Sequence, residues 1–196
     1  MSARLTTWER SCIFSLLSSL YLCKPSREAI AGWRAALANP PPVLRPLQDA
    51  LALIDVDSAQ EQEDLLWEFT RLFIGPYKLA APPWESVYRS KKKLMMQEAA
   101  DEVKRAYADF GLTFDDPAVM PDHIGAELNF LALVYDREGE EAGKPSDCVR
   151  IGEAFLNDHL MKWVPQFTAD METATDAHLY RVLAKTTRNT LELLSA

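Results

Sequence analysis

The chain has 196 residues, of which 48% are hydrophobic and 26% charged, as in an ordinary soluble globular protein. Twenty-one Lys and Arg against 29 Asp and Glu leave a net charge of −8, which argues against nucleic acid as a partner because phosphates need a basic face. The three cysteines, Cys12, Cys23 and Cys148, are too widely spaced for a disulfide framework or a metal site, which favours the reducing cytoplasm.

The first predicted helix begins just after Thr6, which forms a capping box with Glu9. Apolar side chains recur on one face from Trp8 to Tyr21, and serines occupy the opposite face. This pattern indicates a folded helix rather than a signal peptide, and no small-residue cleavage site follows it. The chain contains no run of about 18 uncharged apolar residues, so we predict no membrane-spanning segment.

Three more helices are predicted in the first third of the chain. Ser26 is placed to cap the first of them, and apolar residues at helical spacing over 44–54 mark the second. Ser58 and Glu61 form another capping box, which opens the third. That helix is expected to stop at Gly75-Pro76, because proline cannot continue it.

The segment from Leu72 to Tyr88 is the most informative part of the chain. Its glycine and prolines prevent a helix, yet it is rich in Tyr, Trp, Leu and Val rather than in the polar residues of a surface loop. Such a loop either packs on the body of the protein or lines a binding place. For Trp84, which follows Pro82-Pro83, both interpretations are equally open.

Two short clusters follow this loop. Lys91-Lys92-Lys93 is interpreted as a solvated basic face on an acidic protein, and the sequence does not assign it a role. Met95-Met96 is interpreted as core filler rather than as a recognition surface, although methionine also suits sites that accept varied partners.

Helical periodicity continues to the C-terminus. A stripe from Ala99 to Phe110 ends at Gly111, a helix C-cap. The helix from Ile124 to Tyr135 is apolar almost all round, so it should lie at the centre of the fold. Asp147 and Asp176 are placed to cap the last two helices.

These patterns predict an all-α fold. Strand-like alternation is absent, and the helical stripes indicate about eight to ten helices in one compact multi-helix domain over residues 1–196. Two lobes joined near residues 112–121, where a turn-rich link occurs, are left open as an alternative.

Pro121-Asp122-His123 stands at the head of the apolar central helix. Proline suits a first helical turn, and Asp122 there can accept free backbone N–H groups. Capping does not explain His123, which could instead pair with Glu127 one turn later. A second pair, Asp158-His159, lies far along the chain, and the two pairs lack the spacing of metal ligands, so we predict no metal.

The catalytic repertoire of the chain is small. It has three histidines and no His-Glu-x-x-His, phosphate-binding loop or Gly-x-Ser-x-Gly motif, so we predict that it is not an enzyme. The alternative is a small helical enzyme that uses Asp122 and His123 for proton transfer or metal binding. A purely structural interaction subunit is a third hypothesis.

Three segments together resemble the TorD/DmsD family of redox-enzyme maturation chaperones, and the Pro-Pro-Trp loop resembles its DmsD-like branch. Their order and spacing are more specific than any one of them. They are Leu72–Pro76 with Pro82–Tyr88, then Pro121-Asp122-His123 leading into Glu127-Leu128, and finally His159-Leu160 followed by Trp163, Pro165 and Phe167.

The resemblance implies a cofactor-free, all-helical cytoplasmic chaperone. Family members bind the twin-arginine leader, or the body, of the catalytic subunit of a DMSO-reductase-type molybdopterin oxidoreductase and delay its export until the cofactor is inserted. A transient contact with the export translocase accompanies that role. The resemblance implies a leader-binding region made of Trp84, Tyr77, Tyr88, Pro121, Asp122, His123 and Glu127.

The chemistry of such a leader agrees with these residue types. Two guanidinium groups followed by an apolar stretch need a carboxylate near an apolar groove lined by aromatic rings, because arginine pairs with carboxylates and stacks on rings. The sequence leaves open which oxidoreductase is the client, whether the chain is a monomer or a dimer, and whether a nucleotide binds. No phosphate-loop motif supports nucleotide binding.

Overall fold

The computed structural model describes residues 5–75, 78–91, 93–116, 118–140 and 145–195, and its regular elements there are helices. Ten α-helical segments are described, in agreement with the predicted all-α single domain. Their bounds are α1 Thr7–Leu22, α2 Arg27–Ala36, α3 Arg45–Ala52, α4 Ala59–Phe73, α5 Glu85–Arg89, α6 Glu98–Asp109, α7 Ile124–Glu140, α8 Pro145–Phe155, α9 Met161–Ala174 and α10 His178–Ser195, with a 3-10 turn at Pro42–Leu44 and a π-helical turn at Leu156–Leu160.

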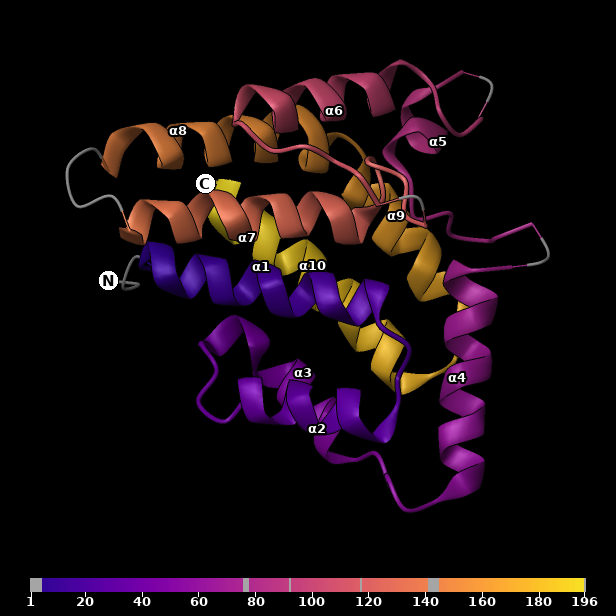
Figure 1. Ribbon diagram of the computed structural model, residues 1–196. Helices are drawn as coiled ribbons and strands as arrows, with labels where there is room; N and C mark the ends of the chain where they lie inside the picture. The colour runs from indigo at the N-terminus through magenta and orange to yellow at the C-terminus, as the bar shows by residue number, and fades with distance from the viewer. Residues whose placement is uncertain (1–4, 76–77, 92, 117, 141–144, 196) are drawn as a thin grey trace.

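Helices α1 and α7 pack side by side at the centre of the molecule (Figure 1). Phe14 stacks on Tyr135 with ring centroids 5.8 Å apart, and the Ser18 hydroxyl donates to the Gly125 carbonyl at 2.7 Å. Gly125 permits this approach, since a Cβ there would lie 2.4 Å from Cγ of Leu22. The central position predicted for α7 from its apolar circumference is therefore confirmed.

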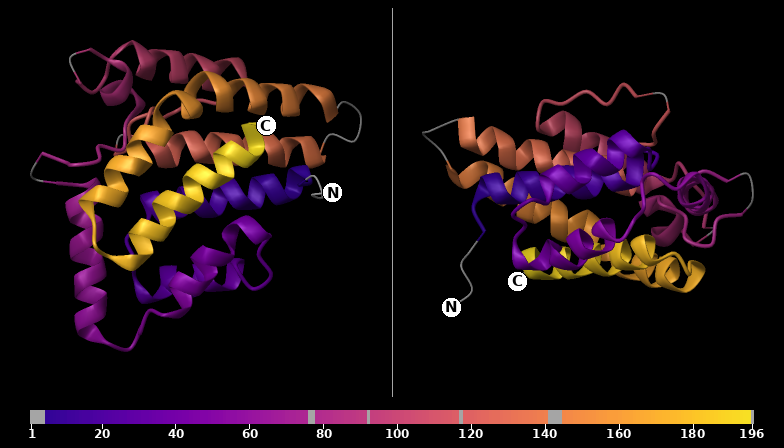
Figure 2. Two further views of the ribbon diagram at one scale, coloured as in Figure 1. Left: turned by 180° about the vertical axis from the view of Figure 1, so that it is seen from behind. Right: turned by 90° about the horizontal axis from the view of Figure 1, so that it is seen from below.

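The remaining helices surround this pair. Helices α6 and α8 lie on one side of α7, and α2 and α3 lie on the far side of α1 (Figure 1). Seen from behind, α10 crosses α1 and α7 obliquely and packs against α9 and α3 (Figure 2). Helix α4 stands across one end of the molecule (Figure 1). None of the helices in the described part of the chain is long and apolar enough to cross a membrane.

Most of the predicted helix boundaries are confirmed by their caps. Thr6 and Glu9 form the reciprocal box, with the Glu9 amide donating to Thr6 Oγ1 at 3.2 Å and the Thr6 amide to the Glu9 carboxylate at 2.7 Å. Ser58 caps α4, but the predicted box there is only half formed, because the Glu61 carboxylate accepts from the Asp55 amide instead. Gly111 follows α6 with φ of 82°, as a C-cap glycine should.

The predicted caps of the last two helices are wrong. Helix α8 begins at Pro145, so Asp147 lies inside its first turn. Helix α10 begins at His178, so Asp176 lies two residues before it, in a turn where the Thr175 hydroxyl accepts from the Ala177 amide at 3.1 Å.

The interpretation of Met95-Met96 as core filler is also wrong. Their side chains are 38% and 69% exposed. The described residues just before α6 bond to one another, as the Leu94 amide does to Ser90 Oγ at 3.1 Å, and α6 begins only at Glu98. These methionines therefore belong to no helical face that the core could cover. Lys91 and Lys93 are exposed, as expected for a solvated face, and Lys92 lies outside the described residues.

Candidate functional site

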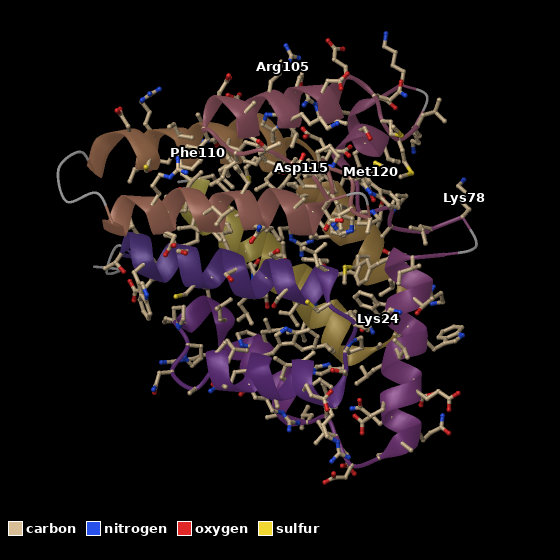
Figure 3. The ribbon with its side chains drawn as sticks, viewed as in Figure 1. Lys24, Lys78, Arg105, Phe110, Asp115 and Met120 are labelled. Carbon is tan, nitrogen blue, oxygen red and sulfur yellow. The ribbon has the colours of Figure 1, made fainter. Side chains whose placement is uncertain are left out.

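The aromatic loop and the Asp-His segment lie directly against each other. Residues Trp84 and His123 form an isolated antiparallel bridge. On its two sides the Glu85 amide donates to the Asp122 carbonyl and the Ile124 amide to the Pro83 carbonyl, both at 2.9 Å. Figure 3 shows Met120, which precedes this segment, beside the N-terminal end of α7. Two motifs about 35 residues apart in sequence thus form one site.

Asp122 holds the start of α5 rather than that of α7. Its Oδ2 accepts from the Ser86 amide at 2.9 Å, and the whole side chain is buried. The prediction that Asp122 caps the central helix is therefore wrong. His123 caps α7 instead: its Nδ1 accepts from the Gly125 amide at 3.0 Å.

His123 can cap a helix because it is neutral. Its imidazole is buried, and this burial lowers its pKa from 6.5 to about 4. A neutral ring leaves one nitrogen free to accept, whereas a protonated ring has only donors. The expected pairing of His123 with Glu127 does not form; Glu127 bonds elsewhere, as described next.

Glu127 is a buried carboxyl that favours its neutral form. Its Oε2 accepts from the indole Nε1 of Trp163 at 3.3 Å. Burial, together with the nearby charge of Glu85, raises the pKa of Glu127 well above its ordinary value. The carboxyl is fully buried, so it supports the packing of Trp163 and cannot contact a ligand at the surface.

Glu85 joins α5 to the π-helical turn beneath the bridge, and its partner Arg89 extends this link to α6. Its Oε1 accepts from Arg89 at 2.7 Å, and its Oε2 lies 3.0 Å from Nδ1 of His159. Arg89 also reaches Glu102 of α6 at 2.9 Å. His159 comes from the π-helical turn, a feature that is often found at functional sites because it re-aims a side chain.

Aromatic rings form the outer part of the site. Trp84 is half-buried and packs edge-to-face on His123, with centroids 6.1 Å apart. Tyr88, also half-buried, packs on Trp163 at 5.6 Å and on Phe167 at 6.2 Å. Burial and the facing carboxylate of Asp170 raise the pKa of the Tyr88 phenol.

Several buried polar atoms of this site make no hydrogen bond within the described part of the chain. They are Nε1 of Trp84, Oγ of Ser86, the hydroxyl of Tyr88, Oδ1 of Asp122 and Oε1 of Glu127. An unpaired buried polar group is costly, so such groups are expected to be satisfied by water or by a ligand. Among the described residues, no group of three or more His, Cys, Asp or Glu side chains is arranged to hold a metal ion.

Comparisons with known proteins place this arrangement in a family. The family model described as nitrate reductase delta subunit matches residues 22–169. The chain belongs to the TorD/DmsD family of redox-enzyme maturation chaperones. It is 28% identical over 147 residues to the chaperone protein TorD of Vibrio parahaemolyticus, covering 74% of this chain and 68% of the relative.

A second relative is the Tat proofreading chaperone DmsD of Salmonella typhi, 28% identical over 180 residues, which cover 90% of this chain and 84% of that one. A crystal structure described as a redox enzyme maturation protein from Archaeoglobus fulgidus shares the fold, with a TM-score of 0.59 and 19% identity over 97% of this chain and 98% of its own. TorD and DmsD are named as chaperones, so this member of their family is a chaperone and not an enzyme. TorD and DmsD match it at the same identity, so the DmsD-like branch stays a prediction.

Six of the seven residues that the resemblance assigned to the site come together in the fold. They are Trp84, Tyr88, Pro121, Asp122, His123 and Glu127, with the carbonyl of Pro121 accepting from the Tyr107 hydroxyl at 2.8 Å. Tyr77 lies outside the described residues. The sequence prediction missed Glu85, His159 and Trp163, although each stands in a segment that carried the family resemblance.

Glu127→Gln should change how the stability of this chaperone depends on pH. Because folding raises the pKa of Glu127, the folded chain keeps a proton that the unfolded chain releases above pH 4.5. Stability from this group is thus lost as the pH rises from 4.5 toward the folded pKa. Gln cannot ionise, and its amide oxygen can still accept from Trp163.

Urea unfolding of both proteins at about pH 4.5 and pH 8 checks this, since effects of other groups cancel in the difference. We expect Glu127→Gln to gain stability relative to the wild type at the higher pH. An identical difference at both pH values would mean that Glu127 is ionised in the folded chain.

Proposed function

We propose that this chain binds the twin-arginine leader of the catalytic subunit of a DMSO-reductase-type molybdopterin oxidoreductase and delays export until the cofactor is inserted. Such a leader must be bound before export, which places the chaperone in the cytoplasm. The observation that supports this best is the bridge between Trp84 and His123. It leaves the half-buried Trp84 ring exposed in part beside His123, and such a ring suits the apolar segment of a leader and can also stack on an arginine.

The residues of the site divide into two roles. Trp84, Tyr88 and the edge of His123 retain exposed surface, so we assign to them the contact with the apolar part of the leader. Asp122 and Glu127 have no exposed surface, so they act by holding the bridge and the helices beneath it. Tyr77 remains a proposed contact on the strength of the family resemblance alone.

The alternative of an enzyme built on Asp122 and His123 finds no support in this geometry. Both side chains are committed to backbone amides, at Ser86 and Gly125 respectively. A transient contact with the export translocase is part of the proposed role. Light scattering of the purified protein would decide between monomer and dimer.

Trp84→Leu should weaken binding of a leader peptide by about 1–3 kcal/mol, because a half-buried tryptophan typically dominates the energy of an apolar interface. His123→Gln should also reduce affinity more than it reduces the melting temperature. Asp122→Asn should affect affinity only modestly, since Asn caps nearly as well as Asp and the side chain is not exposed. Calorimetric titration with leaders encoded in the same genome, beside thermal melts, measures both quantities.

The matched control is Trp8→Leu. Trp8 lies in the first turn of α1, far from the site, and is 70% exposed. Its replacement by Leu is the same chemical change as in Trp84→Leu. This variant should bind the leader like the wild type. Equal losses for Trp8→Leu and Trp84→Leu, or losses of binding in strict proportion to losses of stability, would remove Trp84 from the binding site.

A further inference from the structure

Trp67 is an exposed tryptophan that the site described above does not use. It lies on the outer face of α4, and 63% of its surface is open. It lines a hollow of about 580 Å³ between α4 and the turn joining α9 to α10. The buried face of α4 is the opposite one, with Leu65, Phe69 and Leu72 in the core. Tryptophan is enriched at interfaces because its ring is apolar while its N–H can still form a hydrogen bond.

The hollow already shows which ligand chemistry Trp67 accepts. The guanidinium carbon of Arg71 lies 5.7 Å from the centroid of the indole ring. Arg71 itself is committed, because it makes two hydrogen bonds to Glu68, at 2.8 and 2.6 Å, and a third to the carbonyl of Ala174. Because 63% of the Trp67 surface is exposed, part of the ring stays open to a second guanidinium.

Two carboxylates in the hollow, Asp64 and Asp176, lie outside the ion pair that Arg71 forms with Glu68. Asp64 lies one turn before Trp67 on α4, is exposed, and has no ion pair in the described part of the chain. Asp176 faces it from the turn before α10; its ion pair with Arg181 is 3.8 Å long and largely exposed, and the charge of Arg71 also acts on it from within the hollow. Exposed pairs at this distance are weak, so Asp176 can exchange its partner.

The hollow lies within reach of the aromatic site along α9. Phe167, on which Tyr88 packs, is seven residues before Ala174, which lines the hollow. At 1.5 Å per residue this is about 10 Å along the helix axis. An extended peptide advances about 3.3 Å per residue, so roughly three to four residues span the gap. A leader in which arginines precede an apolar stretch by a few residues fits this separation.

We propose that the hollow of Trp67, Asp64 and Asp176 binds the arginine pair of the leader, while the Trp84 site binds its apolar stretch. This inference rests on the proposed function. It assigns the arginines to accessible carboxylates beside an open ring, in place of Asp122, whose carboxylate is fully enclosed. Guanidinium favours such a place because it pairs with carboxylates and stacks on indole at once.

The test combines protein variants with peptide variants in one calorimetric series. The peptides are the client leader and the same leader with both arginines replaced by alanine. The proteins are the wild type, Trp67→Leu and the double variant Asp64→Asn with Asp176→Asn. All three positions are exposed, so these proteins should fold. Asp101 is an exposed aspartate on α6, so Asp101→Asn controls for the loss of a negative charge outside the hollow. Trp8→Leu controls for the loss of an exposed indole ring.

We expect Trp67→Leu to weaken binding of the arginine leader about threefold and the double variant about fivefold, the sizes of exposed stacking and ion pairing. Neither change should affect the alanine leader. If the wild type and the hollow variants lose equal affinity when alanine replaces arginine, the arginines bind elsewhere and only this inference fails. If the wild type binds neither peptide, the proposed function itself fails and this inference falls with it.

Discussion

Glu85→Ala should lower the free energy of unfolding by about 3 kcal/mol, because removing one partner of a buried ion pair leaves the others uncompensated. The Glu85 carboxylate is fully buried and joins Arg89 of its own helix to His159 of the π-helical turn. Without it, His159 loses its partner and Arg89 keeps only Glu102. Urea unfolding at neutral pH measures the loss directly.

Glu102→Ala is the matched control for this prediction. It removes the other carboxylate that contacts Arg89, but the Glu102 side chain is 33% exposed. Pairs that water can reach contribute little, so this variant should lose under about 1 kcal/mol. Glu85→Gln, which keeps the shape and one acceptor oxygen, should fall between the two. If Glu85→Ala costs no more than Glu102→Ala, the buried carboxylate does not hold α5 to the rest of the site.

The helices and most of their ends could be predicted from the sequence, because local residue patterns determine them. Thr6, Ser26 and Ser58 mark three helix starts, and each caps its helix through the amide three residues later. The central helix could be recognised because its sequence is apolar almost all round, which is typical of a buried helix. Gly111 has the positive φ that its position at a helix end suggests.

The inner half of the site could not be predicted, because tertiary packing determines it. The π-helical turn that brings His159 to Glu85 leaves no mark in the periodicity of apolar residues. Charged residues are rarely fully buried, so nothing local indicates that Glu85 is. His123 serves as a cap only because burial keeps it neutral, and burial is a property of the folded chain.

The neutral state of His123 leads to a second large effect. Its pKa falls from 6.5 to about 4 on folding, so between these values the unfolded chain binds a proton that the folded chain does not. Stability from this group is therefore fully present above pH 6.5 and is lost as the pH falls toward 4. One proton contributes about 1.4 kcal/mol per pH unit, which gives about 2 kcal/mol lost at pH 5 and about 3 kcal/mol near pH 4.

His123→Asn isolates this effect, because Asn does not titrate and its side-chain oxygen can still accept from the Gly125 amide. Urea unfolding of both proteins at pH 7, 6 and 5 gives the difference between them at each pH, in which the shared carboxyl titrations cancel. The wild type should lose about 2 kcal/mol against the variant over this range. A difference that stays constant with pH would mean that the folded chain accepts the proton, and Nδ1 of His123 could then not be what caps α7.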